Sequence, residues 1–177
     1  MKVCEKRTGW WLNDEPCTDS FCQLKTETNF KTFALEIAME TIQERQNEII
    51  EEFELFDDWM QKYEYLIELG KSLPLIDEQF KTEDNIIKGC QSQVWLHATN
   101  NGELVRYTAD SDAILTKGLI ALMIRVLDGQ APKEIVDAKM DFVDAIGLKE
   151  HLSPTRANGL LNMIKQMKFY ALAMQAK

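Results

Sequence analysis

The chain has 177 residues, of which 45% are apolar and 28% charged, a composition typical of a globular protein with a single domain. Its net charge of −9 argues against non-specific nucleic-acid binding, which needs cationic side chains to displace counterions from phosphates. No apolar run approaches the roughly 20 residues of a membrane span, and the N-terminus lacks the apolar core of a secretory signal. We therefore expect a cytoplasmic protein without nucleic-acid or membrane partners, in which cysteine thiols stay reduced.

The first 38 residues differ in character from the remainder. Three of the four cysteines lie here: Cys4, Cys17 and Cys22. Both histidines lie far downstream, so a fourth ligand for a zinc site cannot be identified, and we expect no metal site. No helical or strand period runs through this stretch. We predict an N-terminal extension over residues 1–38, either poorly ordered or produced by a start codon placed too far upstream, and one domain over residues 39–177.

Apolar residues recur at helical spacing after the extension. The stripe follows steps of three, four and seven residues and consists of Ile42, Ile49, Phe53, Phe56, Met60, Tyr63 and Ile67. Gly70 and Pro74 mark its expected C-terminal end. Asp58 and Gln61 have capping-box spacing, so one bent helix and two helices in series both fit the pattern. We interpret the stripe as core packing.

Two strand-like runs follow, at residues 93–99 and 103–108. They are joined by Asn100-Asn101-Gly102, and Asn-Gly between two such runs is a strong β-hairpin signal. A third strand is expected near Ile86-Ile87. The sheet predicted here is therefore small and antiparallel.

Helical patterns return after the second strand. Asp110 or Ser111 is predicted to cap a helix that is apolar on nearly every side, as expected for a helix buried against a sheet. Pro132 and Pro154 each occupy the favoured first position of a further helix. The predicted fold class is α+β, with the small antiparallel sheet packed against helices.

Cys90 is the one cysteine in residues 23–177. A buried structural cysteine normally lies within an apolar run, whereas Cys90 lies in a polar loop directly before a strand. Its neighbours indicate a thiol near the surface that is available to react, and the nearby cation of Lys88 would raise the thiolate population. An inert loop cysteine fits these local residues equally well.

The residues that flank Cys90 have two possible uses. Gly89 would supply backbone freedom to a loop that must reach a partner. The polar side chains of Gln91, Ser92 and Gln93 could donate hydrogen bonds to the sulfur, or could satisfy only the backbone of the loop.

Several blocks of the chain, in the same order, resemble the SufE family of sulfur-acceptor proteins. The first is Asn85-Ile86-Ile87-Lys88-Gly89-Cys90-Gln91-Ser92-Gln93-Val94-Trp95-Leu96. The second is Ala109-Asp110-Ser111-Asp112-Ala113, followed by Lys117-Gly118-Leu119-Ile120-Ala121. The third is His151-Leu152-Ser153-Pro154-Thr155-Arg156, followed by Gly159-Leu160. With an upstream piece at residues 59–73, the resemblance covers roughly residues 45–175.

This resemblance implies a SufE/IscU-like fold and a role in sulfur transfer. Cys90 would accept sulfane sulfur from a cysteine desulfurase of the SufS type, stimulate that enzyme, and pass the sulfur to a SufBCD-like scaffold that assembles iron–sulfur clusters. The pyridoxal phosphate would reside on the desulfurase, so no cofactor of this chain is implied. Such a chain is an accessory protein and not a stand-alone enzyme. The resemblance also implies control of the cysteine loop by Asp112, beside Asp110, and a desulfurase contact at Arg156.

Three other functions are weighed against this one. An IscU-type cluster scaffold would need several cysteine or histidine ligands, and the domain offers one cysteine. A hydrolase would need His97 or His151 within hydrogen-bonding reach of Cys90. A docking or regulatory module for a desulfurase would need no reactive cysteine at all, and a Cys90→Ser substitution would leave its function intact.

Overall fold

The computed structural model describes residues 40–175, which follow the predicted order of helices, hairpin and helices. Helices α2 (Ile42–Glu54) and α3 (Trp59–Lys71) and the short 3-10 turns η1 (Glu78–Phe80) and η2 (Glu83–Asn85) come first. The hairpin of β1 (Val94–Asn100) and β2 (Val105–Ser111) is next. It is followed by α4 (Ile114–Leu127), α5 (Pro132–Asp137), α6 (Phe142–Ala145), α7 (Leu148–His151) and α8 (Pro154–Gln175). Cys4, Cys17, Cys22 and the predicted extension lie outside the described residues, and the domain boundary stays a prediction.

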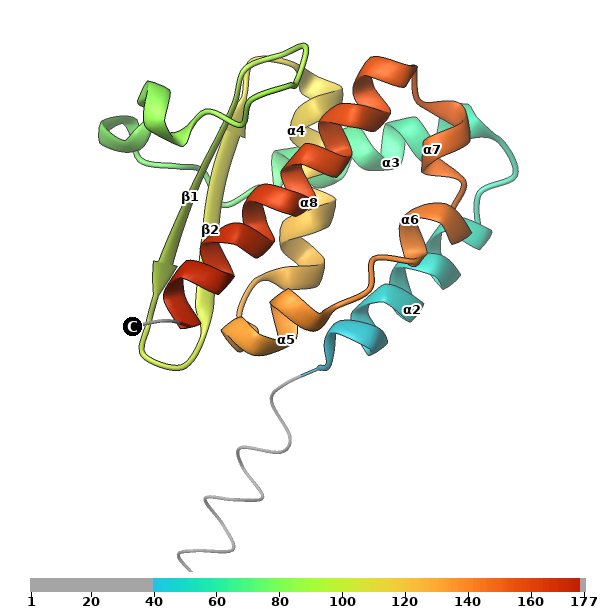
Figure 1. Cartoon of the computed structure of the whole chain (residues 1–177). Coiled ribbons are helices and arrows are strands. Elements are labelled where there is room, and N and C mark those ends of the chain that lie inside the picture. Colours follow the sequence, from blue (N-terminus) through green and yellow to red (C-terminus); the bar gives the residue numbers. More distant parts are fainter. Residues whose placement is uncertain (1–39, 176–177) are drawn as a thin grey trace, which may run out of the picture. The chain divides into compact units, whose positions relative to one another are not determined.

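Helix α4 lies at the centre of the fold. It contacts β2, α2, α3 and α8, and Figure 1 shows α4 and α8 running side by side along one face of the hairpin. Ten of the fourteen residues of α4 are buried, as its all-round apolar sequence predicts. The α+β fold class, with a small antiparallel sheet packed on helices, is thereby confirmed.

The N-terminal helical pattern forms two helices in series. Helix α2 ends before Leu55, and Asp58 begins α3 by accepting a hydrogen bond from the backbone N–H of Gln61 at 2.9 Å. The chain breaks between the two helices, so the apolar spacing of α2 does not continue into α3. The prediction that one stripe runs through both helices is therefore wrong at Met60, which is 67% exposed. Leu66 is fully buried instead. Gly70 was expected to end this helix but lies within it.

The hairpin lies in the predicted place, with β1 and β2 paired antiparallel from Val94–Ser111 to Asn100–Val105. Its loop is closed by a 3.0 Å hydrogen bond from Asn101 N–H to the Leu104 carbonyl. The prediction of a third strand is wrong. The segment near Ile86-Ile87 makes one isolated bridge with β1, between Ile86 and Trp95, and a 2.8 Å hydrogen bond from Ile87 N–H to the Val94 carbonyl. The chain turns at Lys88-Gly89, directly after Ile87, and the pairing ends there.

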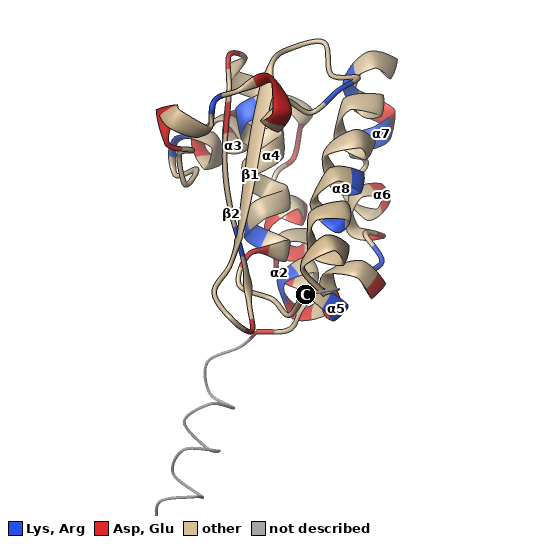
Figure 2. Ribbon diagram, turned by 60° about the vertical axis from the view of Figure 1, so that its left-hand side comes forward, with Lys and Arg blue, Asp and Glu red and all other residues tan. Residues whose placement is uncertain are grey.

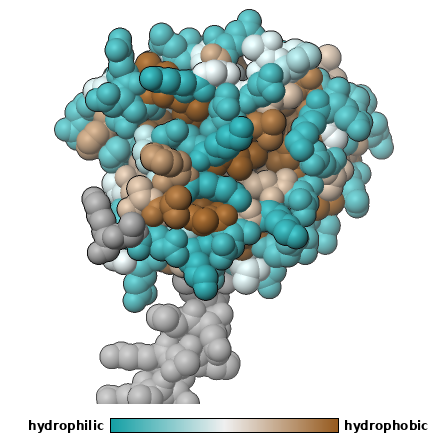
Figure 3. All heavy atoms as spheres, in the orientation of Figure 1, coloured by the Kyte–Doolittle hydropathy of each residue, from teal (hydrophilic) through white to brown (hydrophobic). Residues whose placement is uncertain are grey.

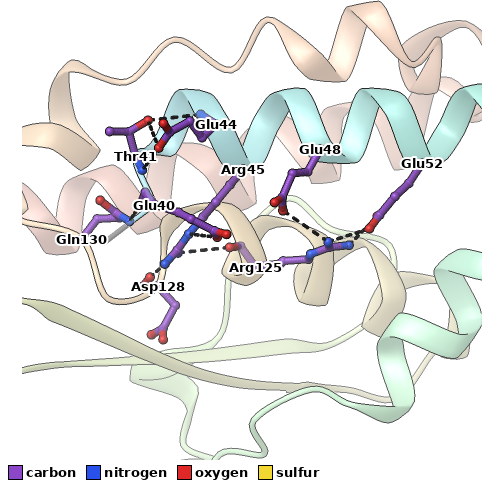
Figure 4. Close-up of polar contacts among 9 residues, drawn as sticks. All are labelled: Glu40, Thr41, Glu44, Arg45, Glu48, Glu52, Arg125, Asp128 and Gln130. Carbon is purple, nitrogen blue, oxygen red and sulfur yellow. Dashed lines mark hydrogen bonds and ion pairs between the residues drawn. The ribbon is translucent and has the colours of Figure 1, made fainter. Parts of the chain in front are cut away.

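A polar cluster connects α2 to α4, as Figure 4 shows. The Arg125 guanidinium donates two hydrogen bonds to the Glu52 carboxylate, at 2.5 and 2.7 Å. Arg45 donates to the carbonyls of Arg125 and Asp128 at the end of α4. A paired guanidinium and carboxylate at this half-buried position satisfy each other's charge, so α2 is fixed in position against α4.

The surface carries unequal charge. Helix α8 contains basic but no acidic side chains, whereas acidic side chains are frequent on α2 (Figure 2). Apolar patches interrupt the hydrophilic surface on the face drawn in Figure 3. The large apolar side chains that are most exposed are Leu55, Ile114, Met60, Phe169 and Leu75. Among the described helices, none combines the length and the apolar character needed to cross a bilayer.

Candidate functional site

Cys90 lies in the loop between η2 and β1, next to helix α8. Gly89 has φ of +84°, a left-handed conformation that favours glycine and turns the chain toward the thiol. The Cys90 side chain is half-buried, and its S–H donates to the carbonyl oxygen of Gly159 in α8 at 3.7 Å. The predicted loop is thus present, but its thiol rests against a helix instead of projecting into solvent.

The resting environment disfavours ionisation of the thiol. Burial raises the pKa of Cys90, and the hydrogen bond to Gly159 also stabilises the neutral form. Lys88 is exposed and does not offset this rise. The expected increase of the thiolate population by Lys88 is therefore not seen in this conformation, in which burial raises the pKa of Cys90.

A pocket of about 450 Å³ opens beside the thiol. Its walls come from the cysteine loop, the start of α4 and the start of α8, three segments that are far apart in the sequence. The lining residues are Cys90, Gln91, Ser92, Asp112, Ala113, Ile114, Leu115, Thr116, Leu119, Thr155, Arg156, Gly159 and Met163. Of the three ionisable residues predicted to control the loop or contact a partner, Asp112 and Arg156 line this pocket and Asp110 does not.

Loop residues after Cys90 are tied to the rest of the fold. The hydroxyl of Ser92 lies 2.8 Å from that of Thr116 in α4, within hydrogen-bonding distance. The backbone N–H of Gln93 donates to the Asp112 carboxylate at 3.0 Å, and its carbonyl accepts from the Ser111 hydroxyl at 2.8 Å. These contacts fix the loop through the Ser92 hydroxyl and the backbone of Gln93. The two predicted uses of the Gln91 and Gln93 side chains stay predictions. Gln91 is exposed and faces the pocket.

Asp110 has a different role from the predicted helix cap. Ala113 is the N-cap of α4 and supplies no side-chain hydrogen bond, so capping by Asp110 or Ser111 is wrong. Asp110 instead pairs with Lys117 at 2.7 Å and with Lys81 at 2.9 Å. Burial opposes its ionisation, but the hydrogen bonds from both lysines lower the pKa of Asp110. It therefore ties the segment that leads to the cysteine loop onto α4.

Asp112 and Arg156 are exposed side chains that line the pocket from two different segments, the residues before α4 and helix α8. The Asp112 carboxylate accepts a hydrogen bond from the backbone N–H of Gln93, the residue directly before β1. Asp112 therefore lies beside the cysteine loop, as the family resemblance implies. Arg156 lies in the first turn of α8, where a cation opposes the helix dipole. The pocket therefore presents one anion and one cation around a neutral thiol.

The two histidines are not part of this site. His97 stacks on Phe80 with ring centroids 3.9 Å apart, and His151 stacks on Trp59 at 3.8 Å. Neither lines the pocket, which leaves the hydrolase alternative without a base next to Cys90. Within residues 40–175, no three His, Cys, Asp or Glu side chains are grouped to hold a metal ion.

Sequence reasoning missed Asn162. Its side-chain amide donates to the carbonyl of Gly89 at 3.4 Å, across 73 residues of sequence. The one signal available was an asparagine in the interior of a helix, a position where this residue is unfavourable. Gly159 belongs to the third block that resembles the SufE family, but the sequence does not predict its contact with the thiol.

Comparisons with known proteins place the chain in a family. A family model described as "SufE: Fe-S metabolism associated domain" matches residues 47–171. The chain is 44% identical over 140 residues to "SufE-like protein 1, chloroplastic/mitochondrial" of Arabidopsis thaliana, covering 78% of this chain but 38% of that protein. It is also 44% identical over 128 residues to an uncharacterized SufE-like protein of Rhizobium meliloti, covering 69% of this chain and 91% of the relative.

A solved structure supports the fold. It is the solution structure of a hypothetical protein from Thermus thermophilus, which matches with a TM-score of 0.64 at 20% sequence identity. The match covers 75% of this chain and 97% of that one. Identity this low bears on the fold alone, whereas the family model spans the cysteine loop, the pocket and most of α8. The chain therefore belongs to the SufE family, whose domain is associated with iron–sulfur metabolism.

Proposed function

We propose that this protein is a persulfide carrier that accepts sulfane sulfur on Cys90 from a SufS-type cysteine desulfurase. The observation that carries the proposal is the placement of a free thiol in a glycine-containing loop at the edge of an open pocket. Membership of the SufE family supports an involvement in iron–sulfur metabolism. Delivery to a SufBCD-like scaffold and stimulation of the desulfurase belong to the same proposal.

The proposed chemistry needs one cysteine on each protein. The Cys90 thiolate attacks the outer sulfur of a persulfide on the donor, and a new S–S bond forms as the donor's S–S bond breaks. The donor cysteine leaves as a thiolate and takes up a proton, so one sulfane sulfur moves without net oxidation or reduction. Pyridoxal phosphate would act on the desulfurase, where the persulfide is generated.

The proposed transfer requires Cys90 to leave its resting position. A thiol with a raised pKa is a poor nucleophile at neutral pH, because the thiolate is the reactive species. Leaving the contact with Gly159 would remove both the burial and the hydrogen bond that favour the neutral form. Arg156, on the pocket wall, would favour a thiolate or a persulfide anion and would contact the donor.

The second candidate is a docking or regulatory module for a desulfurase in which Cys90 takes no sulfur. The observation that favours it is the half-buried, neutral thiol itself, because buried cysteines in proteins are commonly inert. Both candidates predict binding to the desulfurase. They differ in whether Cys90 becomes covalently modified.

The distinguishing experiment is intact-protein mass spectrometry after incubation with free cysteine and a desulfurase. The carrier predicts added sulfur on the wild type that a reductant removes, and none dependent on Cys90 in the Cys90→Ser variant. If the wild type binds the desulfurase but gains no sulfur at Cys90, the docking module is the correct function. Peptide mapping is needed, because Cys4, Cys17 and Cys22 are also present.

A further inference from the structure

Helix α8 forms a seat for the cysteine loop from two residues on one face. Gly159 accepts the hydrogen bond of the Cys90 thiol, and a Cβ atom added at Gly159 would lie 3.4 Å from Cys90 Sγ. One turn further on, Asn162 lies over Gly89, so closely that a Cβ atom on Gly89 would overlap the Asn162 amide nitrogen. The loop therefore rests on the helix through two consecutive residues, Gly89 and Cys90.

Besides the hydrogen bond of the thiol, Asn162 provides a second polar contact between α8 and the loop. Its amide donates to the Gly89 carbonyl at 3.4 Å, and the side chain is half-buried. Asparagine weakens a helix interior relative to alanine, so this position gives up local helix stability for a contact with the loop. Because Gly89 is the residue with positive φ directly before Cys90, a hold on its carbonyl also fixes the direction of the thiol.

We propose that Asn162 is a positioning residue that holds the Cys90 loop against α8 and so sets how often the thiol is available to an incoming persulfide. This inference rests on the proposed carrier function only for its biological meaning. The effect of Asn162 on the exposure of Cys90 is expected with or without a sulfur donor.

The consequence for reactivity follows from the two states of the loop. In the seated state the S–H donates to Gly159, and a thiolate in the same place would face the carbonyl oxygen without a proton between them. Ionisation therefore favours departure from the seat. Any change that weakens these contacts raises the fraction of molecules in which the loop has left α8. The rate at which reagents modify the Cys90 thiolate rises with that fraction.

The test measures alkylation of Cys90 by iodoacetamide in the full-length protein, followed on the Cys90 peptide by mass spectrometry across a range of pH. Asn162→Ala removes the amide and is compatible with a helix. Asn158→Ala is the matched control, because Asn158 is an exposed asparagine one turn earlier in α8. Both variants leave Lys88, Asp112 and Arg156, the charged groups of the loop and pocket, unchanged.

Loss of one hydrogen bond of ordinary net strength shifts an equilibrium about two- to tenfold. We expect Asn162→Ala to alkylate at Cys90 faster by about that factor than both the wild type and Asn158→Ala. The apparent pKa of its alkylation profile should fall toward that of a free cysteine, with the urea midpoint equal to that of the control. Asn162→Ser, whose hydroxyl is too short to replace the amide, should behave in the same way.

The proposal is overturned if Asn162→Ala and Asn158→Ala give the same alkylation rates and apparent pKa. It is also overturned if faster alkylation occurs only together with a lower urea midpoint, because the effect would then be global. Failure of the carrier function gives a different result: Asn162→Ala alkylates faster, yet the wild type gains no sulfur from the desulfurase.

Discussion

The thiol of Cys90 lies 3.7 Å from the carbonyl oxygen of Gly159, although 69 residues separate them in the sequence. This contact joins the loop before β1 to helix α8 and favours the neutral form of the thiol. The chemistry proposed for the protein needs the thiolate, so the thiol must leave this contact with Gly159 before it can react.

Cys90 should titrate above an ordinary cysteine. Burial raises its pKa, so alkylation of the native protein should reach half of its maximal rate at a pH above the value of about 8.5 expected for a free thiol. The same peptide alkylated in concentrated urea should titrate normally and serves as the reference. A native profile that coincides with the unfolded one would show that the thiol is not seated in solution.

The glycines of α4 and α8 should respond in opposite directions to alanine. A Cβ atom on Gly118 would overlap the Leu66 carbonyl of α3, so Gly118→Ala should destabilise the fold by about 1–3 kcal/mol or more. At Gly159 the nearest atom is 3.4 Å away, an ordinary contact, and the helix gains about 1 kcal/mol of propensity from alanine.

Urea unfolding of both variants checks this pair. Gly159→Ala should be as stable as the wild type or more stable, while Gly118→Ala should unfold at clearly lower urea. Equal midpoints for the two variants would mean that α3 and α4 are not in close contact at Gly118.

Asp110 should contribute stability at neutral pH that is lost in acid. Its pKa is lowered in the folded state, so its contribution is complete above the unfolded value, near the ordinary 3.8, and disappears as the pH falls through the folded value. Asp110→Asn should therefore cost about 1 kcal/mol at pH 7 and reduce the loss of stability between neutral and strongly acidic pH.

Thermal or urea unfolding at several pH values measures this effect, with the exposed Asp137 changed to Asn as the control. If Asp110→Asn and Asp137→Asn give parallel curves, the pairs with Lys81 and Lys117 do not stabilise the protein in solution.

Arg156 should matter for the partner and not for the fold. It is exposed, and a carboxylate suits the first turn of α8 better than a cation does, so Arg156→Glu should not lower the unfolding midpoint. Reversal of a charge at the rim of a protein–protein contact should weaken desulfurase binding roughly tenfold at low salt, and less at high salt. Lys165→Glu, an exposed cation further along α8, is the control. Equal affinities for the two variants would remove Arg156 from the interface.

Local signals in the sequence predicted much of the fold. Pro132 and Pro154 begin helices as expected, since a proline at the first helical position loses no hydrogen bond. The Asn-Gly dipeptide lies in the hairpin loop, where Gly102 has φ of +95°. The polar neighbours of Cys90 indicate a thiol near the surface, and the resemblance to the SufE family identifies the loop.

Features that depend on tertiary contacts could not be predicted in this way. Asp110 is a residue type that often caps helices, but its carboxylate pairs with two lysines from other segments instead of capping α4. Asn162 acts on a loop 73 residues earlier, and nothing local to α8 indicates that partner. The resting state of Cys90 also differs from the expectation, because burial against α8, a helix distant in the sequence, raises the pKa of the thiol.

The decisive experiment for sulfur transfer follows the Cys90 peptide through one complete cycle. Full-length protein is incubated with cysteine and the desulfurase, separated from both, and then mixed with a SufBCD-like scaffold, with mass spectra taken at each stage. If the protein is a persulfide carrier, the Cys90 peptide gains one sulfur atom in the first stage and loses it to the scaffold in the second. A Cys90 peptide that stays unmodified while the desulfurase is bound and active would contradict the carrier function.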